Sequence, residues 1–172
     1  YIRRRSSMRD PHDGDGKVEI SFSVNGQRKT VRAYPMERLL DALRCRLQLT
    51  GAKEGCGEGE CGSCAVLMDD LLVNSCLVPV LQAEGSKILT IEGIAEGETL
   101  HVLQRAFLEF GGAQCGICTP GMILAALHLL NGHAEPTTEE IQEGLAGNLC
   151  RCTGYSQIIE AVAEAAHRRT TS

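Results

Sequence analysis

Apolar and polar residues alternate along the first part of the chain, after a polar start. Positions 17–24 read K-V-E-I-S-F-S-V, and positions 27–33 continue in a second extended pattern. The pair between them, Asn25-Gly26, is the one that a two-residue hairpin turn favours. The sequence therefore predicts an antiparallel β-hairpin over residues 17–33.

A helical pattern follows this hairpin once Pro35 has ended the second strand. Within 37–47 the leucines fall on one face of a helix, which predicts an amphipathic helix packed on the hairpin. The residues on that face are Leu39, Leu40, Leu43 and Leu47. Cys45 falls on the opposite face, so we interpret it as a spare thiol.

A glycine-rich loop at 55–64 precedes a second region of strand-like sequence. We expect residues 65–68 and 71–76 to form a hairpin around Asp69-Asp70, and residues 87–91 to form a last short strand. Together with the first hairpin, these segments predict a small mixed sheet crossed by one helix.

The pattern changes to a helical period from about residue 99. Residues 99–110 and 155–166 carry apolar side chains at helical spacing, and 120–130 is apolar nearly all round, as in a buried helix. Between them, Thr137 and Glu140 form the capping-box sequence that opens a helix. Four helices predict a bundle, so the whole chain is expected to be α+β.

The changes of pattern divide the chain into two domains. Residues 1–16 are polar and are expected to be a disordered or expression-derived arm, with Met8 as a candidate natural start. We expect the first domain over 17–92, a linker over 93–98 and the helical domain over 99–172.

Composition narrows the class of protein. The 172 residues are 43% hydrophobic and 23% charged with a net charge of −5, which argues against nucleic acid as a partner. No apolar run reaches the roughly 20 residues of a membrane span. The basic start is followed by aspartates rather than an apolar segment, so it does not resemble a signal peptide. We therefore expect a cytoplasmic protein.

Eight of the nine cysteines fall into two sets of four. The first set has the C-x4-C-x2-C spacing of plant-type [2Fe-2S] ferredoxins, with a fourth cysteine further on; it comprises Cys56, Cys61, Cys64 and Cys76. The second set pairs C-x2-C with C-x-C, and comprises Cys115, Cys118, Cys150 and Cys152.

Disulfides, zinc and iron-sulfur clusters are the alternatives for such cysteines. Disulfides need an oxidising compartment, which nothing in this sequence indicates. Zinc would fit the C-x2-C of the second set and stays the alternative for either set. The first set favours a cluster, because four glycines between residues 55 and 64 let backbone N–H groups wrap around a group larger than one ion. We expect two [2Fe-2S] clusters.

The surroundings of the second set suggest how it is oriented. Thr119 and Pro120, directly after Cys118, are typical of an N-cap followed by proline at the first helical position. The positive end of that apolar helix would then point at the metal centre. Arg151 is either a surface residue or an electrostatic contributor, and the sequence favours neither.

Three motifs in fixed order resemble one family. Residues 51–64 (G-A-K-E-G-C-G-E-G-E-C-G-S-C), 114–122 (Q-C-G-I-C-T-P-G-M) and 147–155 (G-N-L-C-R-C-T-G-Y) are similar to the iron-sulfur small subunit of molybdenum hydroxylases. This is the family of xanthine dehydrogenase, aldehyde oxidase and carbon monoxide dehydrogenase. The departures, at Ser63, Ala65 and Asp70, involve no cysteine.

The resemblance implies a fold and an electron relay. It implies a β-grasp ferredoxin-like domain followed by a four-helix-bundle [2Fe-2S] domain. In the family, a large subunit carries molybdenum and a pterin, and hydroxylates its substrate with oxygen from water. The cluster on the second cysteine set would take electrons from the pterin, and the cluster on the first set would pass them to FAD on a medium subunit. The resemblance also implies a dimer of heterotrimers, and pterin contacts at Gln114 and Cys152.

The other polar residues carry no chemistry in this interpretation. The histidines lack metal-ligand spacing, and His128 on the apolar helix is expected to be a packed or interface residue. Glu58 and Glu60 are expected to be solvated. We expect no catalytic residue on this chain. The substrate, the final electron acceptor and the relative potentials of the clusters are left open by the sequence.

Overall fold

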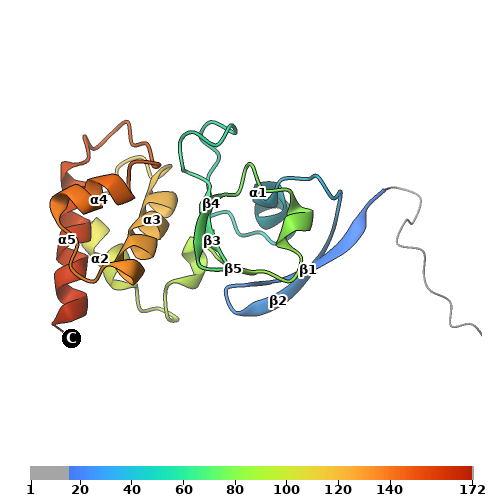
Figure 1. Cartoon of the computed structure of the whole chain (residues 1–172), viewed down its shortest axis with the longest axis horizontal. Helices are drawn as coiled ribbons and strands as arrows, with labels where there is room; N and C mark the ends of the chain where they lie inside the picture. Colours follow the sequence, from blue (N-terminus) through green and yellow to red (C-terminus); the bar gives the residue numbers. More distant parts are fainter. Residues whose placement is uncertain (1–15, 172) are drawn as a thin grey trace, which may run out of the picture.

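The computed structural model describes residues 16–171, so the predicted arm lies almost wholly outside the described residues. Within that range the chain forms a five-stranded mixed sheet followed by a group of helices, placed side by side (Figure 1). The strand order is β2-β1-β5-β3-β4. β1 and β5 pair in parallel and the other neighbours are antiparallel. The α+β prediction is confirmed.

The first hairpin forms where it was predicted. β1 (Val18–Val24) pairs with β2 (Gln27–Ala33) from Val18 opposite Ala33 to Val24 opposite Gln27. Asn25 and Gly26 have φ angles of 51° and 76°, the two positive values that a type I′ turn requires. The buried side chains of β1 are Ile20, Phe22 and Val24.

The helix over the sheet is shorter and wider than predicted. α1 (Leu39–Asp41) is three residues long and continues as the π-helix η1 (Ala42–Arg46), in which the Leu47 N–H bonds to the Ala42 carbonyl. The Arg44 guanidinium holds the carbonyls of Thr50 and Ala52 in the next loop, at 2.8 and 2.6 Å. The predicted apolar face is buried at Leu39, Leu40 and Leu43, whereas Leu47 is only half-buried.

The second hairpin is shorter than the pattern indicated. β3 (Ala65–Met68) pairs with β4 (Leu71–Asn74), and both turn residues, Asp69 and Asp70, have positive φ. β4 ends at Asn74 because the chain turns there, with the Leu77 N–H bonded to the Asn74 carbonyl. Cys76 therefore lies in a turn rather than on the strand.

The last strand, β5 (Lys87–Leu89), also ends before the predicted boundary. The Thr90 N–H bonds to the Asn25 side chain at 2.9 Å instead of continuing the sheet. The 3₁₀ turns η2 (Val80–Ala83) and η3 (Ile91–Gly93) lie on either side of this strand in the chain.

Four helices make up the second half of the described chain. They are α2 (Val102–Glu109), α3 (Thr119–Gly132), α4 (Thr138–Gly144) and α5 (Ser156–Thr170). The predicted capping box at Thr137 and Glu140 is present at the start of α4. α2 begins three residues later than predicted, because His101 is its N-cap and Leu100 is 39% exposed.

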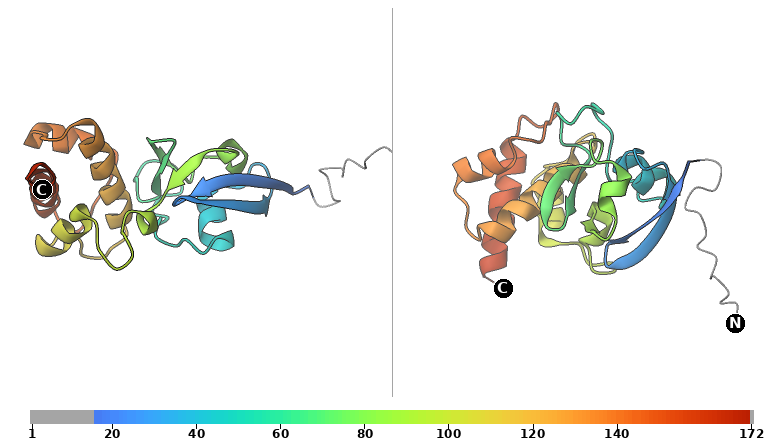
Figure 2. Two further views of the ribbon diagram at one scale, coloured as in Figure 1. Left: turned by 90° about the horizontal axis from the view of Figure 1, so that it is seen from below. Right: turned by 45° about the vertical axis from the view of Figure 1, so that its right-hand side comes forward.

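The molecule has two hydrophobic cores. One joins the sheet to α1 and η1, and includes Ile20, Phe22, Leu39 and Leu40. The other fills the space between the helices, and also takes in Leu67 of β3 and Ile94. α3 lies between the other helices and the sheet, as the two views of Figure 2 show, and it contacts β3 and β4. None of the helices within residues 16–171 has the length and apolar character needed to cross a membrane.

Candidate iron-sulfur centres

The first set of cysteines lies at the edge of the sheet domain. Residues 51–64 connect η1 to β3 without helix or strand, and contain Cys56, Cys61 and Cys64. The turn after β4 brings Cys76 to the same place. Cys64 and Cys76 are almost completely buried, whereas Cys56 is exposed.

The four thiols of this set form two contacting pairs. The Cys56 side chain lies close enough to that of Cys61 for the Cys56 pKa to be affected, and the Cys64 side chain lies close to that of Cys76 in the same way. Cys61 also lies close enough to Cys64 for its charge to affect that thiol. All four side chains therefore belong to one site.

Backbone N–H groups surround the exposed end of this site. Gly57 and Gly59 have φ angles of 74° and 83°, and the Glu58 N–H between them points at the Cys56 sulfur, 3.4 Å away. These backbone hydrogen bonds, first from Glu58 and then from Cys61, lower the pKa of Cys56 to about 7. The loop thus stabilises negative charge on sulfur, which suits both thiolates and bridging sulfides.

The loop is fixed to the rest of the domain by a residue that the sequence did not reveal. The Arg38 guanidinium, at the start of α1, bonds to Asp41 at 2.7 Å and to Glu54 at 2.8 Å. This hydrogen bond to Arg38 lowers the pKa of Glu54, two residues before Cys56. An arginine in an amphipathic helix normally indicates a solvated face, so its position gave no signal.

The second set of cysteines lies in two loops of the helical domain. Cys115 and Cys118 precede α3, and Cys150 and Cys152 lie between α4 and α5. The Cys118 side chain lies next to that of Cys150, and the Cys152 side chain next to that of Cys115, since the second thiol of each pair affects the pKa of the first. This set too therefore forms one site made of two contacting pairs.

The inner and outer cysteines of the second site differ in environment. Cys118 is buried, and burial raises its pKa to about 12, whereas Cys115 and Cys152 are exposed. Burial opposes ionisation of Cys150 as well, but hydrogen bonds from Thr153 outweigh it and lower the pKa of Cys150. One of these comes from the Thr153 hydroxyl, which donates to the Cys150 sulfur at 3.2 Å.

The start of α3 differs from its prediction. Cys118 itself is the N-cap, and Thr119 is the first helical residue, followed by Pro120. The Thr119 hydroxyl oxygen is buried and has no hydrogen-bond partner within residues 16–171. The positive end of the α3 dipole is therefore adjacent to Cys118, as expected, but no side-chain cap produces it.

The remaining predicted residues are found mostly at the surface. Gln114 is exposed next to Cys115, and Arg151 is exposed between the last two cysteines. Cys45, Glu58 and Glu60 are exposed as predicted. His128 is exposed too, so of its two predicted roles, a packed or an interface residue, the packed one does not hold. The residues that directly precede His128 in α3 are buried in the helical core, but His128 itself lies on the exposed face of the helix.

The arrangement of the thiols fits a two-iron group. No three His, Cys, Asp or Glu side chains within the described chain are placed to hold a single metal ion. Each site instead offers two pairs of sulfurs, and a [2Fe-2S] cluster has two iron atoms that share four cysteine thiolates. Gly55 leaves room for such a group, because a Cβ there would lie 2.7 Å from the Cys61 sulfur.

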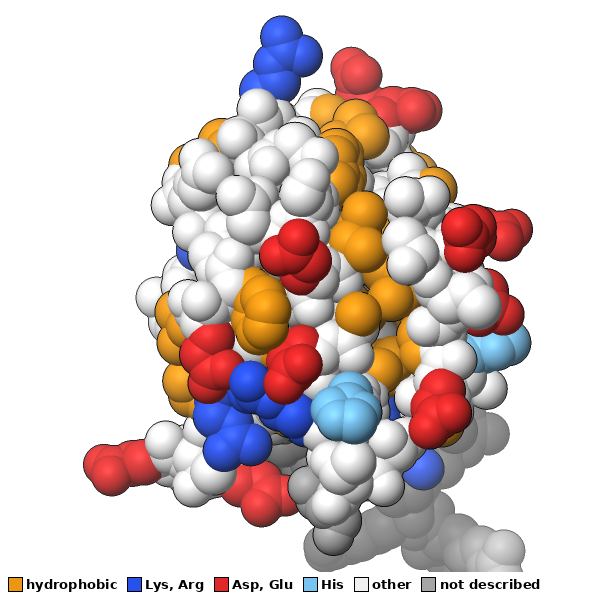
Figure 3. Space-filling view, turned by 90° about the vertical axis from the view of Figure 1, so that its left-hand side faces the viewer, with side chains coloured by type: hydrophobic (Ala, Val, Ile, Leu, Met, Phe, Trp, Pro, Cys, Tyr) orange, Lys and Arg blue, Asp and Glu red, His pale blue; other side chains and the backbone are white. Residues whose placement is uncertain are grey.

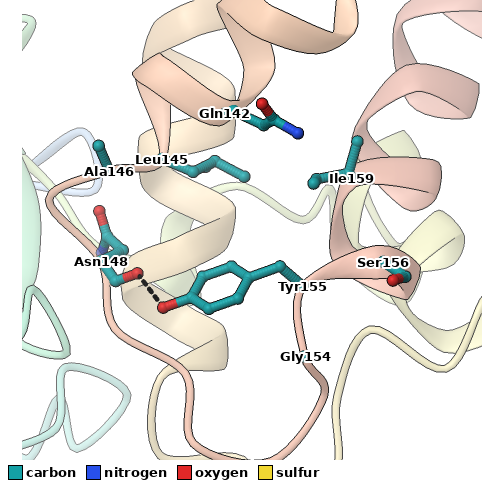
Figure 4. Close-up of a pocket in the computed structure, with 8 residues that line it drawn as sticks. All are labelled: Gln142, Leu145, Ala146, Asn148, Gly154, Tyr155, Ser156 and Ile159. Carbon is teal, nitrogen blue, oxygen red and sulfur yellow. Dashed lines mark hydrogen bonds between the residues drawn. The ribbon is translucent and has the colours of Figure 1, made fainter.

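The second site includes two further residues, Asn148 and Tyr155, for which the sequence predicted no functional role. The Asn148 side chain is 3% exposed and donates a hydrogen bond to the Gly62 carbonyl in the first site, at 2.9 Å. The Tyr155 hydroxyl donates a hydrogen bond to the Asn148 carbonyl at 3.3 Å (Figure 4). It also accepts a hydrogen bond from the Cys150 N–H. Neither residue belongs to an apolar periodicity or a ligand spacing, so no pattern could have revealed these contacts.

A cavity of about 410 Å³ opens beside this pair. Side chains of α4 and α5 line it, together with the loop between them, and Figure 4 shows them around the open space. The lining residues are Gln142, Leu145, Ala146, Asn148, Gly154, Tyr155, Ser156 and Ile159. No thiol lines this cavity, so it is separate from the candidate ligands.

Comparison with protein families assigns both halves of the chain to iron-sulfur domains. Residues 22–90 match the family described as "2Fe-2S iron-sulfur cluster binding domain". Residues 90–163 match the family described as "[2Fe-2S] binding domain". The two matches meet at residue 90, directly after the end of β5.

Characterised proteins similar to this chain include small subunits of oxidoreductases and longer oxidoreductase chains. The chain is 48% identical to the nicotinate dehydrogenase small FeS subunit of Eubacterium barkeri, over 88% of this chain and 97% of that subunit. It is 47% identical to the nicotine 6-hydroxylase small subunit of Paenarthrobacter nicotinovorans, over 92% and 94%. It also matches aldehyde oxidase 1 of Oryctolagus cuniculus at 43% identity, where it corresponds to 12% of a much longer chain.

Solved structures show the same fold. A chain of quinoline 2-oxidoreductase from Pseudomonas putida 86 superimposes with a TM-score of 0.85 at 44% identity, over 90% of this chain and 98% of that one. The aldehyde oxidoreductase of Desulfovibrio gigas gives a TM-score of 0.85 at 39% identity, over 90% of this chain and 17% of that one. With its two cysteine sites, its domain order and these relatives, the chain belongs to the family of [2Fe-2S] electron-transfer subunits of molybdenum hydroxylases.

Proposed function

We propose that this chain relays electrons from a molybdenum-pterin subunit, through its second and then its first cysteine site, to FAD on a third subunit. The observation that carries the proposal is the pairing of the thiols, two pairs in each of two sites that are in contact with each other. Bound at these sites, [2Fe-2S] clusters supply one-electron acceptors and donors.

The pairing also supports an assignment of ligands. Cys56 with Cys61 and Cys64 with Cys76 would each hold one iron of the first cluster. Cys118 with Cys150 and Cys115 with Cys152 would do the same in the second. The thiols of Cys64 and Cys118, whose pKa burial raises, would lose their protons on binding iron.

Exposed residues around the second site support a partner subunit there. Cys115 and Cys152 reach the surface beside Ile117 and Leu149, which are 46% and 54% exposed. Large apolar side chains around a redox centre are typical of a surface that a partner covers. We assign the pterin contacts to this surface, at Gln114 and Cys152, and the large molybdenum subunit as its partner.

The rest of the proposed assembly follows from the relatives. Two of them are named small subunits, and this chain covers nearly all of their length. A medium subunit with FAD would receive electrons near Cys56, the exposed thiol of the first site. The complete enzyme would be a dimer of such heterotrimers. Figure 3 shows a further strip of hydrophobic side chains on the helical end of the molecule, a second area suited to subunit contact.

The proposal is tested first on the metal content and spectra of the chain. We expect about four iron atoms per chain and two separable EPR signals after reduction, since each cluster holds two irons. Cys152→Ser should alter one signal and leave the other, whereas Cys45→Ser, at an exposed thiol outside both sites, should alter neither. A colourless chain with stoichiometric zinc, or loss of both signals in Cys152→Ser, would contradict the proposal.

Purification of the native enzyme tests the partners. The chain should co-purify with two larger subunits that carry molybdopterin and FAD. Purification from the native source as a stable single chain would instead support a free electron carrier of the ferredoxin type.

A further inference from the structure

The two domains touch at the segments that carry the candidate ligands. Gly62 lies in the first ligand loop and faces Gly147 and Asn148, which precede Cys150. Its carbonyl group also lies against Gly121, near the start of α3. A Cβ on Gly62 would come within 2.6 Å of the Asn148 amide nitrogen. Backbone therefore meets backbone here, with the Asn148 side chain packed against Gly62 between the two ligand loops.

Two hydrogen bonds cross this contact. The Asn148 amide donates to the Gly62 carbonyl at 2.9 Å, and the Leu149 N–H donates to the Cys61 carbonyl, also at 2.9 Å. Cys61 belongs to the first site, and Leu149 directly precedes Cys150 of the second. A chain of covalent bonds interrupted by one hydrogen bond thus connects the sulfur of Cys61 with the sulfur of Cys150.

Asn148 is placed to hold this connection. Its side chain is buried against the first loop, and its backbone is held on the other side by the Tyr155 hydroxyl and by the hydrogen bond of its N–H to the Leu145 carbonyl. The same Tyr155 hydroxyl accepts from the Cys150 N–H at 2.9 Å. The residues on both sides of Leu149 are thereby fixed, so the Leu149 N–H stays directed at Cys61.

Tyr155 adopts an uncommon backbone conformation to make these contacts. Its φ angle is 71°, in the left-handed region that aromatic residues rarely occupy. Such strain persists only where the surrounding contacts impose it, and here they are contacts to a ligand and to Asn148. The conformation of the loop between α4 and α5 therefore holds residues 148–150 in place.

We propose that Asn148 is a positioning residue for electron transfer between the two sites, and that the hydrogen bond from Leu149 to Cys61 is the link that electrons cross. This inference rests on the proposed relay. One electron leaves the group held at Cys150, which is oxidised, and arrives at the group held at Cys61, which is reduced. No covalent bond of the chain forms or breaks, and no proton is transferred.

The test compares two asparagines in the full chain with both clusters bound. Asn148→Ala removes the amide that crosses between the domains, while the Gly62 carbonyl keeps its second hydrogen bond, from the Ala65 N–H. Asn74→Ala is the matched control, because the Asn74 amide bonds to the Gly59 carbonyl of the same ligand loop from within the first domain, at 2.6 Å.

Pulsed one-electron reduction, followed optically, gives the rate at which the clusters equilibrate. We expect Asn148→Ala to slow this equilibration severalfold and Asn74→Ala to leave it unchanged. Low-temperature EPR should show weaker magnetic coupling between the two reduced clusters in Asn148→Ala alone. Hydrogen exchange should show faster exchange of the amides at 147–152 in that variant.

The outcomes separate this inference from the proposed relay. Equilibration at the wild-type rate in Asn148→Ala, or an equal slowing in Asn74→Ala, would overturn the role of Asn148 and leave the relay intact. Absence of equilibration in the wild-type chain would overturn the relay itself. If Asn148→Ala loses a cluster, Asn148→Leu removes the donor at nearly constant volume and gives the same comparison.

Discussion

Gly62 illustrates how a single residue can satisfy two requirements at once. Its φ of 68° is strained for any residue with a Cβ, and a Cβ would in addition collide with the loop before Cys150. Gly97 has a similar φ of 60° but open space around it, so glycine is favoured there by the backbone conformation alone and not by a close contact. The sequence shows both as glycines in loops and does not distinguish them.

His101 is a second residue whose role depends on its surroundings. Its Nδ1 atom accepts a hydrogen bond from the Leu103 N–H and caps α2, which requires the neutral imidazole. Burial, and then the nearby charges of Arg169 and Arg105, lower its pKa below the ordinary value of 6.5, while Glu96 acts in the opposite direction. The protonated form would lose the cap.

This lowered pKa predicts a pH dependence of stability. Because folded His101 binds a proton less readily than the unfolded chain does, its contribution is complete above about pH 6.5 and is lost as the pH falls below that value. We expect His101→Asn, which keeps a good cap without titrating, to lose less stability than wild type between about pH 7 and 5. Thermal unfolding of both proteins across this range is the measurement.

A parallel acid profile of the two proteins would contradict this assignment. NMR titration of the His101 imidazole gives a direct check, since its pKa should lie below 6.5. The other histidines and the clusters are common to both proteins, so the comparison removes their contributions.

At the level of single residues, the sequence predicted which side chains could bind metal, but it did not predict which residues contact one another in the fold. The cysteines were found because ligand spacing is local in the chain, and the structure gathers them into two groups. Thr119 was misassigned because Thr-Pro is typical of an N-cap, yet Cys118 already has helical angles and takes that position. Asn148 contacts Gly62 from 86 positions away, and a single sequence has no signal for such a pair.

At the level of elements, α3 is the central support of the helical domain. It is buried along most of its length and contacts α2, α4 and the sheet. Its first turn begins at Cys118, so packing of this helix also fixes half of the second site. Local order at the metal centre is thus a consequence of burial elsewhere on the helix.

A pair of leucines tests this dependence. Leu124 on α3 is 1% exposed, so Leu124→Ala should lower the free energy of unfolding by about 2 to 5 kcal/mol, through lost burial and a cavity. Leu108 on α2 is 67% exposed, and Leu108→Ala should change it by no more than about 0.5 kcal/mol. Denaturant unfolding of the isolated full chain, followed by helical circular dichroism, measures both.

Equal effects of the two substitutions would contradict the packing described for α3. The second-site EPR signal should broaden or weaken in Leu124→Ala and remain unchanged in Leu108→Ala, which links the packing to the site.

Secondary-structure elements were predictable where the sequence pattern that specifies them lies within a few residues. The hairpin turn at Asn25-Gly26 and the capping box at Thr137 are complete within a few residues, and both are present. The π-helix at Ala42–Arg46 was not predictable, because it buries the same leucines as an α-helix, and the hydrogen bonds of Arg44 to the Thr50 and Ala52 carbonyls leave no pattern in the sequence.

At the level of the whole molecule, two cores are connected by a small contact at the ligand loops and by α3. Each core is formed by side chains that need no metal to pack, apart from the buried thiols at their edges. The ligand loops, in contrast, have few backbone hydrogen bonds of their own. The molecule therefore combines two packed cores with ligand loops whose order we expect to depend on the metal.

Removal of iron should affect these parts differently. After treatment with a chelator and reductant, we expect the amides of 55–64 and 114–118 to exchange much faster, because the clusters no longer hold the loops. Amides of β1 and α3 should keep most of their protection, since their cores remain. Hydrogen exchange with mass spectrometry, compared with the untreated chain, measures this.

Global loss of protection on iron removal would show that the clusters, rather than the cores, hold the domains together. An unchanged exchange pattern in the loops would argue that they are not the metal-binding segments.

The contact between the two domains at Gly62, Gly121 and Asn148 has a consequence for how such proteins can diversify. At the ligand loops the junction is made of backbone atoms and one amide, so the side chains that must match between the two halves are the apolar ones where α3 packs on β3 and β4. Recombination that exchanges one half between homologues therefore has to retain these three positions and the apolar contact of α3 with the sheet, whereas the surfaces that contact partner subunits are free to change around them.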